Sequence, residues 1–221
     1  MNNSLSEIKV ESLFKSIPSE LEELFMGVSY PWEVVPLIGE YLKEHIKKDG
    51  LNEIFSGVFV APDVKIAKSA EIQGPAVILS GAEIRHGAYI RGNAFIGRGC
   101  VVGNSCEIKN ALLFDKAQVP HYNYVGDSIL GTRSHLGAGA ITSNLKSLGT
   151  PVSIHAEAEI NTGLRKLGAI LGDNADVGAG CVLNPGTIIG AGSVIYPLTS
   201  LRGVVPSGVI VKKQNEFTKR I

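Results

Sequence analysis

The feature that most constrains the fold of this chain is an aliphatic residue that returns at every sixth position. An α-helix needs apolar spacings of three and four residues and an amphipathic strand needs a spacing of two, so a sustained spacing of six fits neither. A second column, four residues after each member, consists almost entirely of small residues. The six-residue series contains Val60, Ile66, Ile72, Ile78, Ile84, Ile90, Ile96, Val102, Ile108 and Phe114, then Leu130 and Leu136, then Leu171, Val177, Leu183, Ile189 and Ile195.

A six-residue period is typical of a parallel β-helix, a solenoid in which short strands wrap a narrow prism. Large aliphatic side chains fill the interior of such a prism, and small residues line its crowded corners. The composition agrees, because 26 of the 221 residues are glycine and only 6% are aromatic. The core must therefore be built from small and aliphatic side chains, and we predict an all-β solenoid.

The chain divides into an N-terminal helical segment, residues 1–57, and a β-helix domain, residues 58–221. In the first segment Ser19 and Glu22 have the spacing of a capping box, and residues 33–48 carry apolar side chains at helical spacing. We predict that these helices form an N-terminal α-helical cap over the open edge of the solenoid, because an exposed strand edge promotes aggregation.

Charge and hydropathy exclude several classes of partner. Lys plus Arg and Asp plus Glu both number 21, so the chain has no net field that would attract nucleic acid or an anionic membrane. The first residues contain acids instead of the bases of a signal peptide, and no apolar run approaches the length of a membrane span. We expect a soluble, cytoplasmic protein with no nucleic-acid or membrane partner.

The three cysteines all fall in the column of small residues. Cys100, Cys106 and Cys181 are therefore predicted to be buried packing residues, not nucleophiles or metal ligands. We predict no metal site in this protein.

The six-residue series is interrupted twice. Neither the step from Phe114 to Leu130 nor the step from Leu136 to Leu171 is a multiple of six. Insertions in a solenoid become loops on one face and commonly carry the functional site. We therefore expect site residues in or beside residues 119–131 (VPHYNYVGDSILG) and 135–145 (HLGAGAITSNL).

The repeat resembles that of the hexapeptide acyltransferase superfamily. That resemblance implies a left-handed β-helix with three hexads in each triangular coil, and the 17 hexads of the series then predict about six coils. The two interrupted segments, together with TGLRKLGAILGD at residues 162–173, resemble the acetyltransferase half of the bifunctional enzymes that make UDP-N-acetylglucosamine. They are also similar to archaeal sugar-1-phosphate nucleotidylyltransferase/acetyltransferases. The likeness covers roughly residues 84–200.

This resemblance implies an acetyl-CoA-dependent N-acetyltransferase that acts on an amino-sugar 1-phosphate, with glucosamine 1-phosphate as the first expectation. It also implies a homotrimer with active sites between adjacent prisms. The segment before the repeat contains no counterpart of a uridylyltransferase domain, so nucleotidyl transfer is not expected.

Arg91 and Lys109 are candidate phosphate ligands. Their spacing equals three hexads, one full coil, so they should stack on one wall with their side chains outward. Two stacked cations repel each other unless an anion bridges them, but a solvated basic ladder relieved by Glu107 fits the spacing equally well. The resemblance favours the phosphate clamp, because both positions match sugar-phosphate contacts of the family.

The remaining catalytic candidates come from the same resemblance. His121 matches the general base, a role that suits imidazole because its ordinary pKa of about 6.5 lies near working pH. Tyr124 matches an acceptor contact whose hydroxyl could also orient the imidazole, and Asn144 matches the residue that positions the acceptor amine. The turn of Gly137, Ala138 and Gly139 would let the backbone approach the thioester of acetyl-CoA, with an N–H near Ala138 stabilising the oxyanion.

Three further candidates lie where the sequence departs from the family pattern. His135 stands where the bacterial enzymes carry an acceptor-contacting asparagine. Lys146 is the one lysine in a hairpin that tends to carry several in archaeal relatives, and Lys166 aligns with a further phosphate-binding lysine. These differences bear on the identity of the acceptor sugar.

Several other functions compete with this interpretation. The acceptor is alternatively galactosamine 1-phosphate, a nucleotide-linked amino sugar or a hydroxyl group, and the chain is alternatively a non-catalytic β-helix that binds a sugar nucleotide or a partner subunit. A zinc hydratase on the same coil would need a close histidine pair. The histidines at positions 45, 86, 121, 135 and 155 do not provide that spacing.

Overall fold

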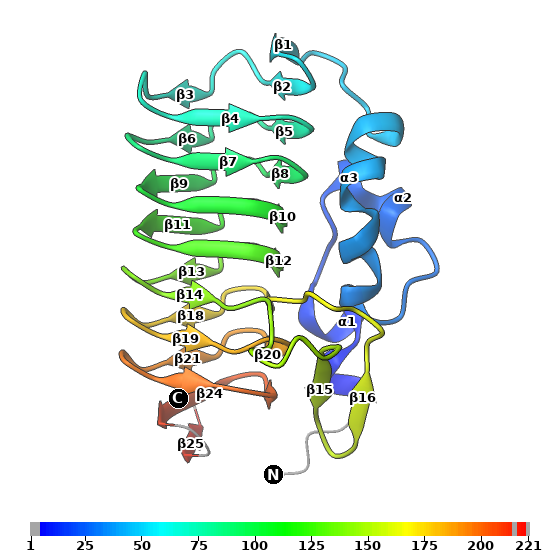
Figure 1. Ribbon diagram of the computed structural model, residues 1–221, viewed down its shortest axis with the longest axis vertical. Helices are drawn as coiled ribbons and strands as arrows, with labels where there is room; N and C mark the ends of the chain where they lie inside the picture. Colours follow the sequence, from blue (N-terminus) through cyan, green and yellow to red (C-terminus); the bar gives the residue numbers. More distant parts are fainter. Residues whose placement is uncertain (1–4, 214–215, 220–221) are drawn as a thin grey trace.

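The computed structural model describes residues 5–213 and 216–219, and it shows a left-handed parallel β-helix with a helical segment along one side (Figure 1). Each coil has three walls. The first, here called the open wall, contains β4 (Glu71–Gln73), β7 (Tyr89–Arg91), the first halves of β10 (Glu107–Leu113) and β12 (Tyr124–Leu130), then β14 (Ile141–Thr142), β19 (Val182–Leu183) and β22 (Ser200–Leu201).

The chain next turns onto the covered wall, which carries the helical segment on its outer face. β10 and β12 continue around the corner into this wall. Its other strands are β2 (Val58–Val60), β5 (Ala76–Ile78), β8 (Ala94–Ile96), β17 (Ala169–Leu171), β20 (Thr187–Ile189) and β23 (Val204–Val205).

The third wall is a nine-stranded sheet in which all neighbouring strands are parallel except the last pair, β24 and β25. It contains β3 (Lys65–Ile66), β6 (Glu83–Ile84), β9 (Val101–Asn104), β11 (Gln118–His121), β13 (His135–Leu136), β18 (Asp176–Val177), β21 (Val194–Ile195), β24 (Val209–Lys213) and the antiparallel β25 (Glu216–Lys219). More coils are therefore stacked than the six predicted.

One of the additional coils comes from residues 114–130, where the six-residue series is interrupted. Ile96 pairs with Leu113 and Leu113 pairs with Leu130, so two successive steps on the covered wall are each one residue shorter than three hexads. Residues 119–131 thus belong to β11 and β12 of the regular coil, and the prediction that they form a loop is wrong.

The same one-residue shortening corrects the position of Phe114. Leu113 takes the interior place, and Phe114 points outward against the helical segment. Its ring centroid lies 4.9 Å from that of Phe14 and 6.0 Å from that of Phe25. Every other predicted interior residue lies in the interior core or, for Ile66, packs against it.

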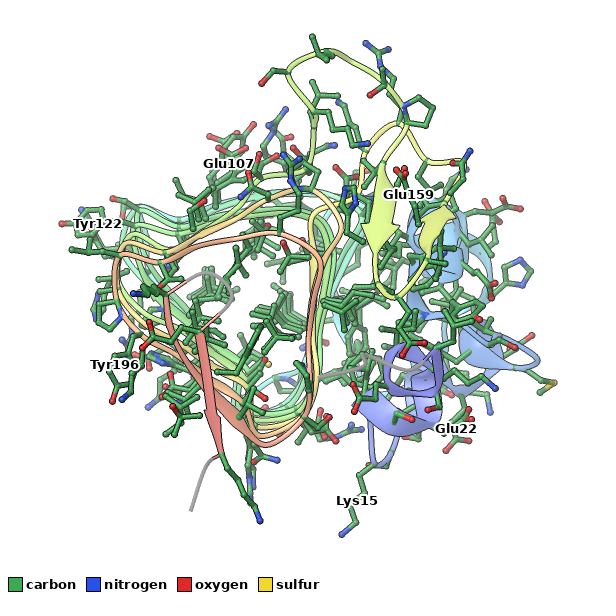
Figure 2. The ribbon with its side chains drawn as sticks, turned by 90° about the horizontal axis from the view of Figure 1, so that it is seen from below. Lys15, Glu22, Glu107, Tyr122, Glu159 and Tyr196 are labelled. Carbon is green, nitrogen blue, oxygen red and sulfur yellow. The ribbon has the colours of Figure 1, made fainter. Side chains whose placement is uncertain are left out.

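The second interruption is a true excursion. The chain leaves the coil after Thr142 and returns at Ala169, and in between β15 (Ser153–His155) and β16 (Glu159–Asn161) form an antiparallel hairpin. Leu145 and Lys166 bridge the neck of this excursion. Figure 2 shows the loop projecting outward from the wall that carries Glu107.

The N-terminal segment is helical, as predicted, but it lies against the covered wall and not over an open end (Figure 1). At the N-terminal end of the solenoid, the edge strand β2 is instead paired by the antiparallel β1 (Asn52–Phe55). The helices are α1 (Val10–Leu13), α2 (Glu22–Phe25) and α3 (Ile38–Glu40), with 3-10 turns at Leu5–Ile8, Ser19–Leu21 and Pro31–Leu37 and a π-helical turn at Tyr41–His45.

The predicted capping box at Ser19 and Glu22 is wrong. Ser19 begins a 3-10 turn, and its hydroxyl donates to its neighbour Glu20 at 3.2 Å. The capping box lies instead at Tyr30, whose backbone N–H donates to Glu33 at 3.3 Å. No helix among the described residues is long and apolar enough to cross a membrane.

Candidate active site

The open wall brings Arg91 and Lys109 onto adjacent coils. Pairing of Tyr89 with Glu107 and of Ile90 with Ile108 sets the register of β7 and β10, so the next residue of each strand also lies side by side. Lys109 in turn pairs with Gly126 on β12. These residues form one outward-facing column along the wall.

Each cation of this column has a carboxylate partner. Arg91 Nη1 lies 2.6 Å from Glu107 Oε1, and Lys109 Nζ lies 3.5 Å from Asp127 Oδ2. The Glu107 carboxylate raises the pKa of Arg91. An incoming anion must therefore compete with these carboxylates, and the long Lys109 contact is the easier one to exchange.

Tyr124 and Asn144 meet directly above Gly126. Asn144 Nδ2 donates to Tyr124 Oη at 3.2 Å. A Cβ on Gly126 would lie 2.5 Å from that hydroxyl oxygen and 2.8 Å from Asn144 Nδ2. Because real Cβ atoms do not approach so closely, the absence of a side chain at Gly126 allows the pair to form.

The phenol of Tyr124 remains protonated. Burial, followed by the negative charge of Asp127, raises its pKa above the ordinary value of 10.0. Its hydroxyl accepts a hydrogen bond from Asn144, so its own proton is available to a ligand. Among the described residues, its hydrogen bond is with Asn144 and not with the His121 imidazole.

His121 ends β11 at the corner between the third wall and the open wall, and its side chain is exposed. Its backbone is fixed by two hydrogen bonds: its N–H donates to Asn123 Oδ1 at 3.0 Å, and its carbonyl accepts from Gly139 N at 2.9 Å. Asn123 is buried and also donates to the carbonyls of Gly137 and Ala140. The corner is therefore rigid while the imidazole faces solvent.

The turn of Gly137, Ala138 and Gly139 lies one coil beyond His121 at the same corner. Gly137 donates its N–H to Val177, and Gly139 donates to His121. Within residues 5–213 and 216–219, the N–H of the exposed Ala138 has no partner. It is thus the one N–H of this turn that is free to bind an oxygen.

Three predicted residues are not gathered with the others. His135 lies on the third wall, with its Nδ1 2.8 Å from Asp176 Oδ1. Lys166 is exposed at the neck of the excursion. Lys146 lines a groove together with His155, Asn184 and Arg202. Their roles stay predictions.

Sequence reasoning missed Asp127, a buried carboxylate that contacts Lys109, Asn110 and Asn144. It has a positive φ of 49°, as does Asn110 on the preceding coil. Asn93, one coil earlier, has a φ of 51°. The sequence signal for Asp127 was its position: it occupies the corner place that is asparagine on the two preceding coils.

The cysteines are buried, as predicted, and outside this cluster. Burial raises the pKa of the Cys100 thiol to about 12 and also raises those of Cys106 and Cys181. A thiol with so high a pKa is a poor nucleophile. The described residues contain no group of three or more potential metal-ligating side chains.

Comparison with known proteins agrees with this architecture. The family model described as "GMPPB C-terminal domain" matches residues 72–164. The putative uncharacterized acetyltransferase YaiX of Escherichia coli K12 is 30% identical over 205 residues, which cover 85% of this chain and 89% of YaiX. The β-helical fold and this likeness define the class: the chain belongs to the hexapeptide-repeat acyltransferases.

The chain is also similar to parts of other proteins. The bifunctional protein GlmU of Methanococcus maripaludis is 38% identical over 78 residues, or 35% of this chain and 19% of GlmU. The chain therefore aligns with about a fifth of that relative's length. Among solved structures, PerB from Caulobacter crescentus in complex with CoA and GDP-perosamine is 18% identical, with a TM-score of 0.35 over 69% of this chain and 52% of PerB.

Proposed function

We propose that this enzyme transfers the acetyl group of acetyl-CoA to the amino group of an amino-sugar 1-phosphate, with glucosamine 1-phosphate as the first candidate. The observation that carries the proposal is the stacking of Arg91 and Lys109 on the same wall as the Tyr124–Asn144 pair. Stacked cations suit a phosphate, and the amide and phenol beside them suit the hydroxyl and amino groups of a sugar.

In this proposal His121 is the general base. As the neutral sugar amine attacks the thioester carbonyl, a C–N bond forms and the nitrogen loses a proton to the imidazole. The Ala138 N–H stabilises the negative charge on the carbonyl oxygen. The C–S bond then breaks, and the departing CoA thiolate takes the proton from the imidazolium. Transfer is direct, since the buried cysteines provide no acyl carrier.

The groove beside the excursion supports a second acceptor, a nucleotide-linked amino sugar. Ser143 and Asn184 continue the Arg91–Lys109 column, because Thr142 pairs with Leu183 and Val125 pairs with Thr142. The groove that these two residues line also contains Lys146, His155 and Arg202. A longer anionic acceptor would extend along the open wall into this basic groove. Lys166, at the neck of the excursion, would add a further positive charge.

A homotrimer is part of the proposal. Tyr122 projects from a corner of the prism and Tyr196 from the wall beside that corner (Figure 2), with exposed fractions of 65% and 44%. Leu198, in the same column as Gly139 and Gly180, is 85% exposed. These exposed side chains lie on several coils along the side of the prism that carries His121 and suit contact with a second copy. His135 on the third wall would then contact the acceptor held by a neighbouring prism. Light scattering on the purified protein measures the assembly directly.

The proposal is tested by following thiol release from acetyl-CoA with glucosamine 1-phosphate, with a nucleotide-linked amino sugar as a second acceptor. We expect turnover by the wild type and a roughly 10²- to 10⁴-fold loss of kcat in His121→Ala, the usual effect of removing a general base. The matched control is His86→Ala, because exposed His86 lies in the same corner column two coils earlier and contacts Ser69. Absence of turnover with every amino sugar would leave a non-catalytic binding role.

A further inference from the structure

The corner between the open wall and the covered wall contains a column in which one residue differs from its neighbours. Asn93, Asn110 and Asp127 occupy equivalent places on three successive coils, each with a positive φ. Asparagine and aspartate tolerate this left-handed backbone better than other residues with a side chain. The backbone therefore accounts for an asparagine at all three places, but it does not account for a negative charge at the third.

The contacts of the Asp127 carboxylate account for the charge. Its Oδ2 lies 3.5 Å from Lys109 Nζ and accepts a hydrogen bond from Asn144 Nδ2. Its Oδ1 accepts from Asn110 Nδ2 at 2.8 Å. The Asp127 side chain is only 7% exposed, so these polar contacts are needed to keep its carboxylate buried. Asp127 thus joins the proposed phosphate ligand Lys109 to the proposed amine ligand Asn144.

The carboxylate also determines the orientation of the Asn144 amide. An ionised carboxylate only accepts hydrogen bonds, so the NH₂ group of Asn144 must face it. The same Nδ2 donates to Tyr124 Oη, so both amide protons are engaged. Among the described residues, Asn144 Oδ1 has no partner, and it remains available to accept a hydrogen bond from a substrate N–H.

We propose that Asp127 is a positioning residue that fixes Lys109 and the Asn144 amide in one geometry and so sets the separation between the phosphate and the amino group of the acceptor. This inference rests on the proposed function. Asp127 does not contact the acceptor, and its effect passes through Lys109, Asn144 and, one bond further, Tyr124.

The test is the Asp127→Asn variant in the full-length enzyme. Asparagine already occupies this corner on the two preceding coils, so the variant retains the backbone but loses the charge and one pure acceptor. We expect kcat to fall roughly 10- to 100-fold, the effect of misplacing a reacting group by about 1 Å. We also expect KM for glucosamine 1-phosphate to rise several-fold, with KM for acetyl-CoA unchanged.

Two further variants separate positioning from general stability. Asp115→Asn is the matched control, because Asp115 accepts from the backbone N–H of Arg98 at 2.8 Å at a corner away from the site. It should shift the melting temperature about as much as Asp127→Asn while leaving the kinetics unchanged. In an Asn144→Ala background, Asp127→Asn should cause little further loss of kcat, since its effect on the reacting amine passes through that amide, while its effect through Lys109 on the KM for the acceptor should remain.

The outcomes distinguish this inference from the proposed function. A wild type that acetylates no amino-sugar phosphate overturns the proposed function, and this inference with it. An active wild type overturns the inference alone if folded Asp127→Asn keeps wild-type kcat and acceptor KM. The inference is also overturned if the fold-losses of kcat in Asp127→Asn and Asn144→Ala multiply fully in the double variant.

Discussion

The open and covered walls have the same interior and opposite exteriors. Both place buried aliphatic residues toward the axis of the prism. On the covered wall the outward residues that directly precede the inward residues are apolar throughout. They include Val77, Phe95, Leu112, Ile129, Ile170, Ile188 and Val204. On the open wall the outward column that follows the inward residues begins with Gln73, Arg91, Lys109 and Gly126. The inward residue of each repeat therefore specifies the coil, and the outward residues decide whether a wall packs against the helical segment or presents polar side chains.

The largest expected effect separates the two walls by stability. Phe95 is fully buried between the covered wall and the helical segment, so Phe95→Ala should lower the free energy of unfolding by about 3–5 kcal/mol. Arg91→Ala removes an outward, solvent-screened side chain from the open wall one strand earlier and should leave the unfolding midpoint close to that of wild type. Denaturant unfolding of both variants measures the difference. Similar losses would show that the exteriors do not differ in the way described.

The next effect concerns activity on the open wall. Gly126→Ala places a methyl group against Tyr124 Oη and Asn144 Nδ2, so we expect kcat for acetyl transfer to fall roughly 10- to 100-fold. The control is Gly208→Ala, which has a positive φ of 67° but no atom within 4 Å of the added Cβ. It should lose some stability and retain the rate. Normal kinetics in Gly126→Ala would exclude the Tyr124–Asn144 pair from catalysis.

A smaller effect tests how the helical segment is attached. Glu20 forms an ion pair with Arg98 of the coil. Burial alone would raise the pKa of Glu20, but the hydrogen bonds and charge of Arg98 outweigh it and lower the pKa below 4.5. A depressed native pKa stabilises the fold above the unfolded value and loses that contribution as the pH falls through the native value.

We therefore expect Glu20→Gln to lower the free energy of unfolding by less than about 1 kcal/mol at pH 7, because the Arg98 side chain is 46% exposed. The difference from wild type should shrink from about pH 5 downward. Glu11→Gln is the control, since its contact with Lys9 is 4.0 Å and its side chain is 72% exposed. A difference that persists undiminished at pH 3 would contradict the assigned ion pair.

The smallest effect is expected inside the prism. Cys106→Ala removes a buried sulfur that accepts and donates hydrogen bonds only within the coil. Because direct transfer uses no thiol, kcat should stay within about twofold of wild type. In the native protein a thiol reagent at pH 8 should react slowly with all three cysteines, whose pKa values are raised by burial. Rapid labelling of Cys106 with loss of activity would reopen a covalent mechanism.

The fold was predictable because each hexad places one aliphatic residue in the interior of the prism, and these residues recur at a fixed spacing in the sequence. The predicted register of the repeat failed at one point, for a physical reason. Leu112, Leu113 and Phe114 are all apolar and all buried, so the loss of one residue from the coil leaves an apolar residue in either phase. The sequence also contains the apolar outward residues of the covered wall, against which the helical segment packs. They can be recognised as one column only after each hexad has been assigned to a wall.

The candidate site was predicted by motif and not by geometry. The sequence pattern identified His121, Tyr124 and Asn144 as separate candidates. The structure adds that Asn144 binds Tyr124 and Asp127 and that Gly126 makes room for the pair. Side-chain contacts between residues one coil apart leave no periodic signal. Glu107 was named beside the two cations from the sequence, but Asp127, the partner of Lys109 and Asn144, was not.

The preference for a phosphorylated acceptor tests the central claim most directly. We predict that kcat/KM for glucosamine 1-phosphate exceeds that for glucosamine by at least about 100-fold, a difference of about 2.7 kcal/mol, and that combined replacement of Arg91 and Lys109 by alanine removes most of that preference. Equal use of the two sugars by the wild-type enzyme would contradict the assignment of the open wall as the acceptor site, as would a preference that survives in the double variant.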